Sequence, residues 1–266
     1  MLFNFRLTPL NDVPAWSHRG DQHLYWFGLT YGCYWLSVGD SELFRYREEA
    51  LHGHQYDNFH CEPHVDYPVV RLWEDFLDIL PSVLVPVPES LAENLAACNL
   101  LDWQRRVERW MESKAIDLYE PDYEHATAWV RKRHLTSGHL AAGPNIWAWN
   151  DGTDIHIEWD NRELEMDGIP VWTADLGSWS LPVGDFLDEV RSFNTRLIEA
   201  MQVRVEQIRT NWIRPEVFID KDELVLEQAD RAKWLARSLE GAQQELSFNW
   251  DVVINAIARI EAETKI

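Results

Sequence analysis

Tryptophan is the residue that most constrains how this chain can fold. The sequence contains 15 tryptophans, 8 tyrosines and 10 phenylalanines. Disordered chains are poor in such residues, and bulky indole rings are normally buried. Several tryptophans fall where periodicity predicts helices, namely Trp73, Trp103, Trp110, Trp212, Trp234 and Trp250. We therefore expect a globular protein whose core is filled with aromatic rings. The alternative is an exposed aromatic platform for a sugar or a protein partner.

Apolar periodicity predicts helices in the middle and in the last third of the chain. Val70, Trp73, Leu77 and Leu80 recur at three- and four-residue spacing, which predicts a helix that Pro81 ends. Asp185, directly after Gly184, is expected to cap a later helix. The further helices are expected over 89–114, within 123–135, from 185 to about 212, over 221–239 and over 246–260.

Two regions of the sequence predict antiparallel strands. Aromatic and β-branched runs flank Thr30-Tyr31-Gly32, which predicts a hairpin, and Asp40 or Ser41 is expected to cap a helix over 41–51. Further along the chain, Asp151-Gly152 predicts a tight hairpin turn. The sequence thus predicts an α+β fold, in which antiparallel β-hairpins pack against several α-helices and the C-terminal third is helical. We expect one compact domain over 1–266, with possible lobes over 1–140 and 141–266.

The strand that follows the Asp151-Gly152 turn supplies the candidate binding face. Side chains alternate along a strand, so Ile155, Ile157 and Trp159 are expected to point inward. The opposite face carries acidic and imidazole groups that could meet a basic partner, or could simply be the solvated face of an antiparallel sheet. The candidate partner-binding residues on and beside this face are Asp154, His156, Glu158, Asp160, Trp147 and Trp149.

The net charge of the chain indicates which classes of partner it could bind. The sequence contains 45 acidic and 24 basic residues, which gives a net charge of −21 at pH 7. A nucleic-acid-binding protein needs a basic surface, and an anionic membrane would repel this chain. We therefore expect neither direct nucleic-acid binding nor membrane binding. Clustered carboxylates instead favour association with a basic protein.

The cysteines and the N-terminal sequence predict a cytoplasmic location. Cys33, Cys61 and Cys98 are odd in number and far apart, so they indicate neither a disulfide framework nor a thiolate zinc site. Cys33 and Cys98 are expected to be small core residues. The N-terminus lacks the cationic start and apolar core of a secretory signal.

A histidine-rich segment is the candidate metal site. His52, His54, His60 and His64 fall close together, with Cys61 beside them. Imidazole and thiolate ligands suit zinc, but the segment matches no known zinc spacing. The segment is therefore expected to be a metal-free polar loop, with a metal site as the alternative.

No motif indicates catalysis or a bound cofactor. The sequence has no nucleophile elbow, no P-loop and no dinucleotide-binding glycine pattern. Pairs of carboxylates carry little information in a chain this acidic. The sequence therefore predicts no catalytic residues and no cofactor.

Four segments together resemble an uncharacterised family of bacterial cytoplasmic proteins. They are FNFRLTPL, WFGLTYGCYWLSVG, VVRLWEDFLDILP and LPVGDFLDEVRSFNTRLIEAMQVRV. Proteins of this appearance are similar to the acidic immunity proteins of polymorphic-toxin systems. The resemblance implies no catalytic motif and brings no functional residues with it.

These observations predict a non-enzymatic immunity protein. It would bind a cognate protein toxin with a basic surface and occlude its active site. The alternatives are a metal-dependent enzyme that uses the His52–His64 region and a regulatory interaction protein.

Overall fold

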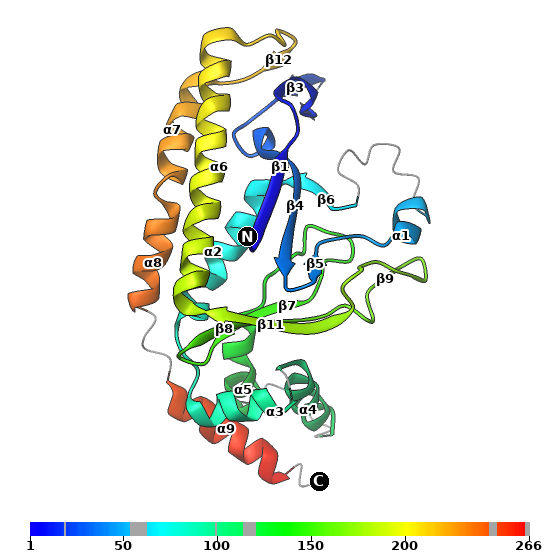
Figure 1. Cartoon of the computed structure of the whole chain (residues 1–266), viewed down its shortest axis with the longest axis vertical. Coiled ribbons are helices and arrows are strands. Elements are labelled where there is room, and N and C mark those ends of the chain that lie inside the picture. The colour runs from blue at the N-terminus through cyan, green and yellow to red at the C-terminus, as the bar shows by residue number, and fades with distance from the viewer. Residues whose placement is uncertain (19, 54–62, 99, 114–120, 245–248, 264–266) are drawn as a thin grey trace.

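The computed structural model describes residues 1–266 except 19, 54–62, 99, 114–120, 245–248 and 264–266 (Figure 1). The strands are β1 (Phe3–Leu7), β2 (Trp16–His18), β3 (Asp21–His23), β4 (Tyr31–Val38), β5 (Ser41–Leu43), β6 (Val65–Pro68), β7 (Ile146–Asn150), β8 (Asp154–Asp160), β9 (Glu165–Met166), β10 (Ile169–Pro170), β11 (Leu176–Pro182) and β12 (Val217–Phe218). The helices are α1 (Glu48–Gly53), α2 (Val69–Leu84), α3 (Glu89–Cys98), α4 (Leu100–Ser113), α5 (Pro121–Arg131), α6 (Val183–Asn211), α7 (Lys221–Arg231), α8 (Trp234–Gln244) and α9 (Trp250–Glu263). The fold is α+β with mostly antiparallel pairing, as the sequence predicted.

Strand β4 is the centre of the first sheet. It pairs antiparallel with β1, β5 and β6, and Phe3 lies opposite Leu36 in the β1 register. The prediction of a hairpin around Thr30-Tyr31-Gly32 is wrong. Residues 31–38 form one continuous strand, which follows a 3-10 turn at Gly28–Thr30. Gly32 instead allows the backbones of β4 and β1 to approach closely, because a Cβ at this position would lie 2.3 Å from the carbonyl oxygen of Arg6 on β1.

The chain turns at Gly39-Asp40 and continues as strand β5. The prediction of a helix that begins at Ser41 is therefore wrong, because residues 41–43 form a strand and helix α1 begins only at Glu48. The apolar side chains of Leu43 and Phe44 are buried in the core. Pairing of residues 41–43 with β4 is the physical reason that the local helix signal fails.

The second sheet has the order β11-β8-β7 and contains the predicted hairpin. Asp151-Gly152 forms its turn, and Gly152 has φ +102°, a conformation that favours glycine. Ile155, Ile157 and Trp159 are buried, as the alternation predicted.

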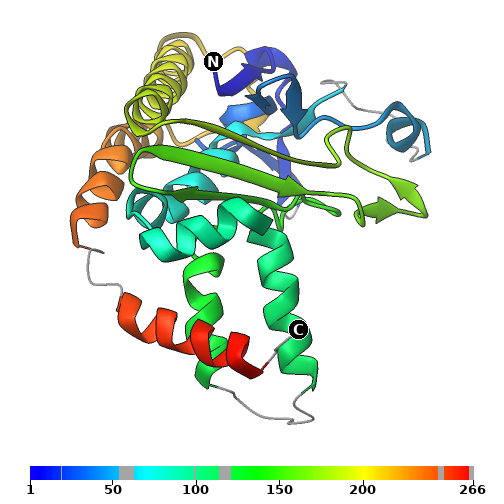
Figure 2. The same ribbon diagram turned by 60° about the horizontal axis from the view of Figure 1, so that its bottom comes forward.

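Both faces of this sheet are covered along β7 and at the end of β8, whereas Leu176, Ser178 and Ser180 on the outer face of β11 are exposed. Ile146, Ala148 and Ile157 belong to the large core, which also contains residues of α2 and α6. Trp147 and Trp149, on the other face, belong to a second core formed with α3, α4, α5 and α9. Figures 1 and 2 show these four helices gathered on that side of the sheet. The solvated outer face expected for β8 is therefore wrong at Glu158 and Asp160, which are buried, whereas Asp154 and His156 on the same face are half-buried.

Helix α2 is confirmed, but it does not end at Pro81. The helix continues to Leu84, and Val70, Trp73, Leu77 and Leu80 are buried along it. Proline has no N–H, so the carbonyl of Leu77 loses its helical donor. The hydroxyl of Ser238 on α8 donates a hydrogen bond to that carbonyl at 2.9 Å. Packing against α8 thus compensates for the defect that the proline introduces.

The long helix expected over 89–114 is two helices, α3 and α4. The backbone N–H of Leu100, at the start of α4, donates to the carboxylate of Glu158 at 2.7 Å. A buried anion at the first turn favours a new helix start there, because the free N–H groups carry partial positive charge. Trp103 and Trp110 are buried on α4, as predicted.

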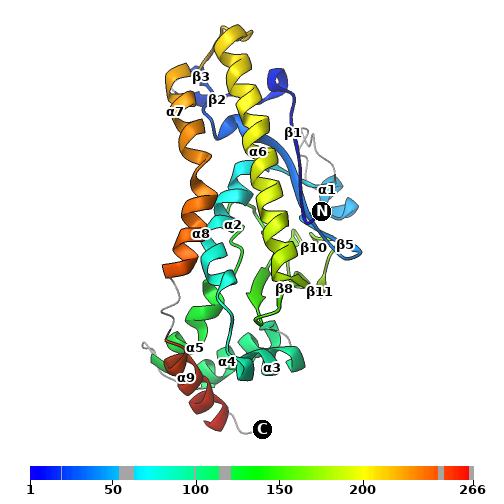
Figure 3. The same cartoon turned by 60° about the vertical axis from the view of Figure 1, so that its left-hand side comes forward.

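The C-terminal third is helical, as predicted. Helix α6 buries the expected stripe of Phe186, Val190, Phe193, Leu197, Met201 and Ile208. Asp185 does not cap it: Pro182 occupies the cap position and makes no side-chain cap bond. The helix expected over 221–239 is divided into α7 and α8. Figure 3 shows α6 running beside α7. No helix among the described residues has both the length and the apolar character needed to cross a membrane.

A third, small sheet with the order β12-β3-β2 was not predicted. Strand β12 lies between α6 and α7 in the sequence and pairs parallel with β3. Strand β2 pairs antiparallel with the other edge of β3. Figures 1 and 3 place this sheet at the end of the molecule opposite α9.

We predict that Trp103→Ala destabilises the protein by about 3–5 kcal/mol, because the substitution leaves a cavity that neighbouring side chains fill only in part. The Trp103 ring packs on Trp129 with centroids 5.5 Å apart. Urea unfolding provides the measurement, with Glu112→Ala at an exposed position of the same helix as the control. Equal stability of the two variants would contradict the assignment of Trp103 to the second core.

Candidate functional site

The acidic face predicted on β8 is an internal contact. Glu158 is buried, and its carboxylate accepts hydrogen bonds from the Trp149 indole and the Leu100 N–H, both at 2.7 Å. Burial raises the pKa of Glu158. The carboxylate therefore joins the sheet to the start of α4 and is not available to a partner.

Asp160 is also buried, and two arginines compensate its charge. Arg162 lies 2.6 Å and Arg105 3.4 Å from its carboxylate. The hydrogen bonds from Arg162 lower the pKa of Asp160. Glu158 and Asp160 thus do not form the exposed acidic patch that the sequence predicted.

Trp147 and Trp149 are buried in the second core, so the surface role predicted for them is wrong. The Trp149 ring stacks on His156 with centroids 4.1 Å apart, and Trp147 stacks on His134 at 4.9 Å. His156 also contacts Asp151 at 2.8 Å. Asp154 and His156 are half-buried. The structure therefore brings the predicted residues together, but around a packed aromatic cluster.

Most of the histidine-rich segment lies outside the described residues. His54, His60 and Cys61 are not described, and only the backbone of His52 is placed, in α1. His64 is described: its ring stacks on Trp35 at 4.2 Å and lies 3.2 Å from Glu42. Burial lowers the pKa of His64. In the described part of the chain, no group of three His, Cys, Asp or Glu residues could hold a metal ion.

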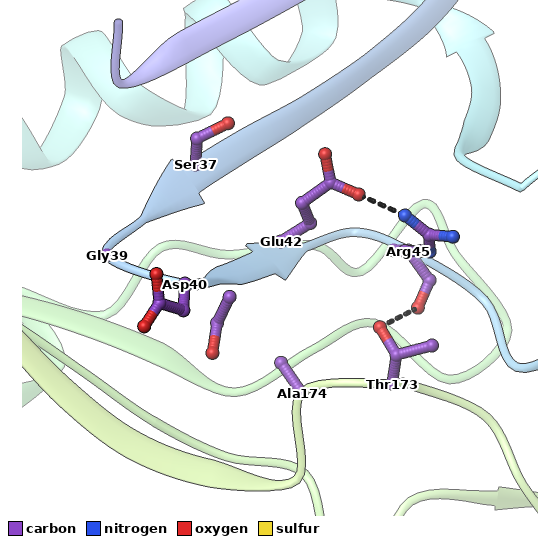
Figure 4. A pocket seen from close by; sticks show the side chains of 8 residues that line it. Ser37, Gly39, Asp40, Glu42, Arg45, Thr173 and Ala174 are labelled. Atoms are coloured by element: carbon purple, nitrogen blue, oxygen red, sulfur yellow. Dashed lines mark hydrogen bonds and ion pairs between the residues drawn. The ribbon is translucent and has the colours of Figure 1, made fainter.

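A polar pocket of about 460 Å³ lies between the β4–β5 turn and residues 173–174 (Figure 4). It is lined by Ser37, Gly39, Asp40, Ser41, Glu42, Arg45, Thr173 and Ala174. Arg45 donates to Glu42 at 2.5 Å. Burial alone would raise the pKa of Glu42, but hydrogen bonds from Arg45 and His64 lower it. Glu42 therefore stays ionised at neutral pH, which suits it to binding a polar or cationic group and not to donating a proton.

The sequence interpretation missed an exposed aromatic row on the small sheet. Trp16 and Phe218 are both register partners of His23, so the three side chains share one face of the sheet. The His23 ring lies 5.4 Å from Phe218 and 6.1 Å from Tyr25, measured between centroids. Trp16, Tyr25 and Phe218 remain 49%, 47% and 59% exposed. Strands of two or three residues are too short for periodicity to reveal.

The comparison with protein families agrees with the resemblance to an uncharacterised family. A model described as a family of unknown function (DUF5984) matches residues 2–256. The chain belongs to DUF5984. No curated protein and no solved structure gave a significant match. The match covers the large core, the small sheet and all of the second core except Ile257 and Ile260. The face of β8, the polar pocket and the aromatic row therefore all lie within the part shared with the family.

We predict that Glu158→Ala destabilises this DUF5984 member by about 2–4 kcal/mol, because the Trp149 indole and the Leu100 N–H lose their buried acceptor. Asp154→Ala, on the same face of β8 but only half-buried, is the matched control. Chemical unfolding of both variants tests this. A loss for Glu158→Ala no larger than that for Asp154→Ala would contradict the internal role of the carboxylate.

A second prediction concerns Asp151 in the β7–β8 turn. Partial burial alone would raise its pKa, but hydrogen bonds from the Asp154 N–H, the His156 ring and the Thr153 N–H lower the pKa from 3.8 to about 2. A depressed acid stabilises the fold above its unfolded pKa and loses that contribution as pH falls toward the folded pKa. Asp151→Asn should therefore cost up to about 2 kcal/mol at neutral pH.

Urea titrations of the wild type and Asp151→Asn between about pH 7 and about pH 3 measure this contribution. The difference in unfolding free energy should shrink as pH falls below about 4, because the wild-type carboxylate begins to be protonated. A difference that stays constant over this range would show that the charge of Asp151 is not the source of the stabilisation.

Proposed function

We propose that this protein is a non-enzymatic immunity protein. It binds a cognate bacterial toxin through the toxin's basic surface and occludes the active site. The toxins that fit this proposal act on nucleic acid, because a cleft that grips phosphates must be lined with lysine and arginine.

The observation that carries the proposal is the surface location of the excess negative charge. Acidic residues outnumber basic ones by 21. If every lysine and arginine neutralised one carboxylate, that excess would still remain. Among the described residues, the buried carboxylates are those of Asp75, Glu158 and Asp160. The excess charge therefore belongs to the protein surface, where it attracts a cationic partner over long range.

The contacts in the polar pocket are consistent with a binding protein. Glu42 pairs with both Arg45 and His64, and Thr173 donates to the carbonyl of Arg45 at 3.2 Å. These contacts join β5 and Arg45 to the residue before β6 and to the loop at Thr173. Glu42 is held ionised by these contacts, and the ring of His64 is stacked on Trp35.

The charge on β8 contributes less than its sequence suggests. Reversing the charge of Asp154 by substitution tests whether this residue attracts the partner. Reversing the charge of Glu158 would instead place a cation in a buried aromatic site and disrupt the fold. Surface carboxylates elsewhere must carry the long-range attraction. They set the association rate, while affinity comes from a few desolvated anchors.

Co-expression in a sensitive host tests the proposal. Products of the genes adjacent to this protein's gene are expressed with and without it, and survival is measured. We expect one product to be toxic alone and harmless in the presence of this protein. If no adjacent product is toxic, or if toxicity persists on co-expression, the immunity function is wrong.

Association kinetics test the electrostatic part of the proposal. The association rate with the toxin should fall steeply as salt rises from about 0.1 M to about 1 M, because the Debye length shortens from about 10 Å to about 3 Å. Stopped-flow or surface-plasmon measurements give this rate. Protection together with a rate that is indifferent to salt would remove charge steering from the mechanism.

A further inference from the structure

We propose that the exposed aromatic row of Trp16, His23, Tyr25 and Phe218 is the docking surface for the basic partner. This inference rests on the proposed function and specifies where the partner binds. The occupant is a folded protein that presents arginine or lysine side chains. In this row the exposed rings of Trp16 on β2 and Phe218 on β12 flank the half-buried His23 on β3, and the exposed Tyr25 follows β3.

Exposure of these rings is not required by the packing of the small sheet. Val217 and Ile219, on either side of Phe218, are buried and attach β12 to the core. Phe218 itself points to the opposite side and is more than half exposed. Trp16 packs on Phe27 with centroids 6.0 Å apart but leaves half of its surface uncovered. Exposed tryptophan, tyrosine and phenylalanine rings are enriched at protein interfaces.

The position of the row is held by the interior of the protein. The Trp212 indole donates to the carbonyl of Val217 at 3.0 Å, and Arg214 donates to the carbonyl of Val13 at 2.6 Å. Arg204 on α6 donates to the carbonyls of Leu29 and Thr8. The strands that carry the rings are thus tied to the end of α6, which makes the surface rigid before binding.

The charge around the row selects a cationic partner. Exposed carboxylates flank the short strands: Asp21 begins β3, Glu216 directly precedes β12, and Asp220 follows β12 after Ile219 and caps α7. The nearby Arg214 is already engaged with Val13 and Glu216. A guanidinium group can lie on an aromatic face while it bonds to a neighbouring carboxylate. A second copy of this chain fits poorly, because each copy carries a net charge of −21.

Binding of a labelled peptide of about ten arginines to the full-length protein tests the surface. Fluorescence anisotropy at about 0.15 M salt gives the affinity. We expect Trp16→Ala combined with Phe218→Ala to weaken binding about tenfold, since two stacking positions are lost. Leu176→Ala, at a 47% exposed apolar residue of β11, is the matched control and should change affinity by less than about twofold. Asp21→Asn should weaken binding more than Glu165→Gln, which removes an equal charge from β9.

A measurement on the wild type guards against misfolding of the variants. In hydrogen exchange, the peptide should protect residues 16–25 and 217–218 and leave β11 unchanged. The proposal is wrong if the wild type does not bind the peptide, if row and control variants lose affinity equally, or if protection lies elsewhere. Self-association of the wild type that the double variant abolishes would assign the row to a second copy and also overturn it.

The co-expression assay separates this inference from the immunity function. If the double variant protects cells as well as the wild type does, the row is not the docking surface, although the immunity function stands. If no adjacent product is toxic, the immunity function fails. The peptide affinity and the exchange pattern then still decide whether the row binds cationic groups.

Discussion

The structure depends on the paired strands β7 and β8, which bury side chains on both faces of their sheet. Strand β8 places Ile155, Ile157 and Trp159 in the large core, and β7 places Trp147 and Trp149 in the core beneath α3, α4, α5 and α9. Burial of rings on both sides removes far more apolar surface from water than a half-exposed sheet would. The arrangement requires that the polar groups of the second face be satisfied internally. Glu158 meets this requirement, because it accepts hydrogen bonds from both Trp149 and the first N–H of α4.

The cover of β8 by helix α4 limits which residues of this strand a partner could reach. Helix α4 covers the acidic residues at the end of β8, and Arg105 and Arg162 neutralise Asp160. The surface that remains acidic lies elsewhere, and exposed aromatic rings join it on the β12-β3-β2 sheet. In the binding mode that we propose, long-range attraction and short-range anchoring coincide at the end of α6. The polar pocket beside β5 is a separate feature, formed by a turn and two loop residues.

Buried arginines connect helices to neighbouring helix ends and loops. Arg133 is fully buried, donates to the carbonyls of Trp129 and Val85, and lies over the Trp129 and Trp250 rings. Burial lowers the pKa of Arg204 to about 10, so the side chain keeps its charge at neutral pH. Guanidinium groups suit these positions, because they bond to several carbonyls at once and stack on indole rings. An acidic protein thus uses part of its limited basic complement inside the fold, which leaves its surface more negative.

The sequence by itself determined the elements whose signal is local. The stripe of α2, the burial of Trp103 and Trp110, the Asp151-Gly152 hairpin and the inward face of β8 all follow from side-chain periodicity and turn chemistry. Tertiary structure alone decided which elements cover which faces. A strand pattern shows that Ile155 and Ile157 point inward, but it cannot show that α4 covers Glu158 from the other side. Strand β4 pairs with β1 across a long loop, and β12 joins β3 from nearly two hundred residues away. Such contacts depend on burial energies summed over distant segments, which no short window of sequence contains.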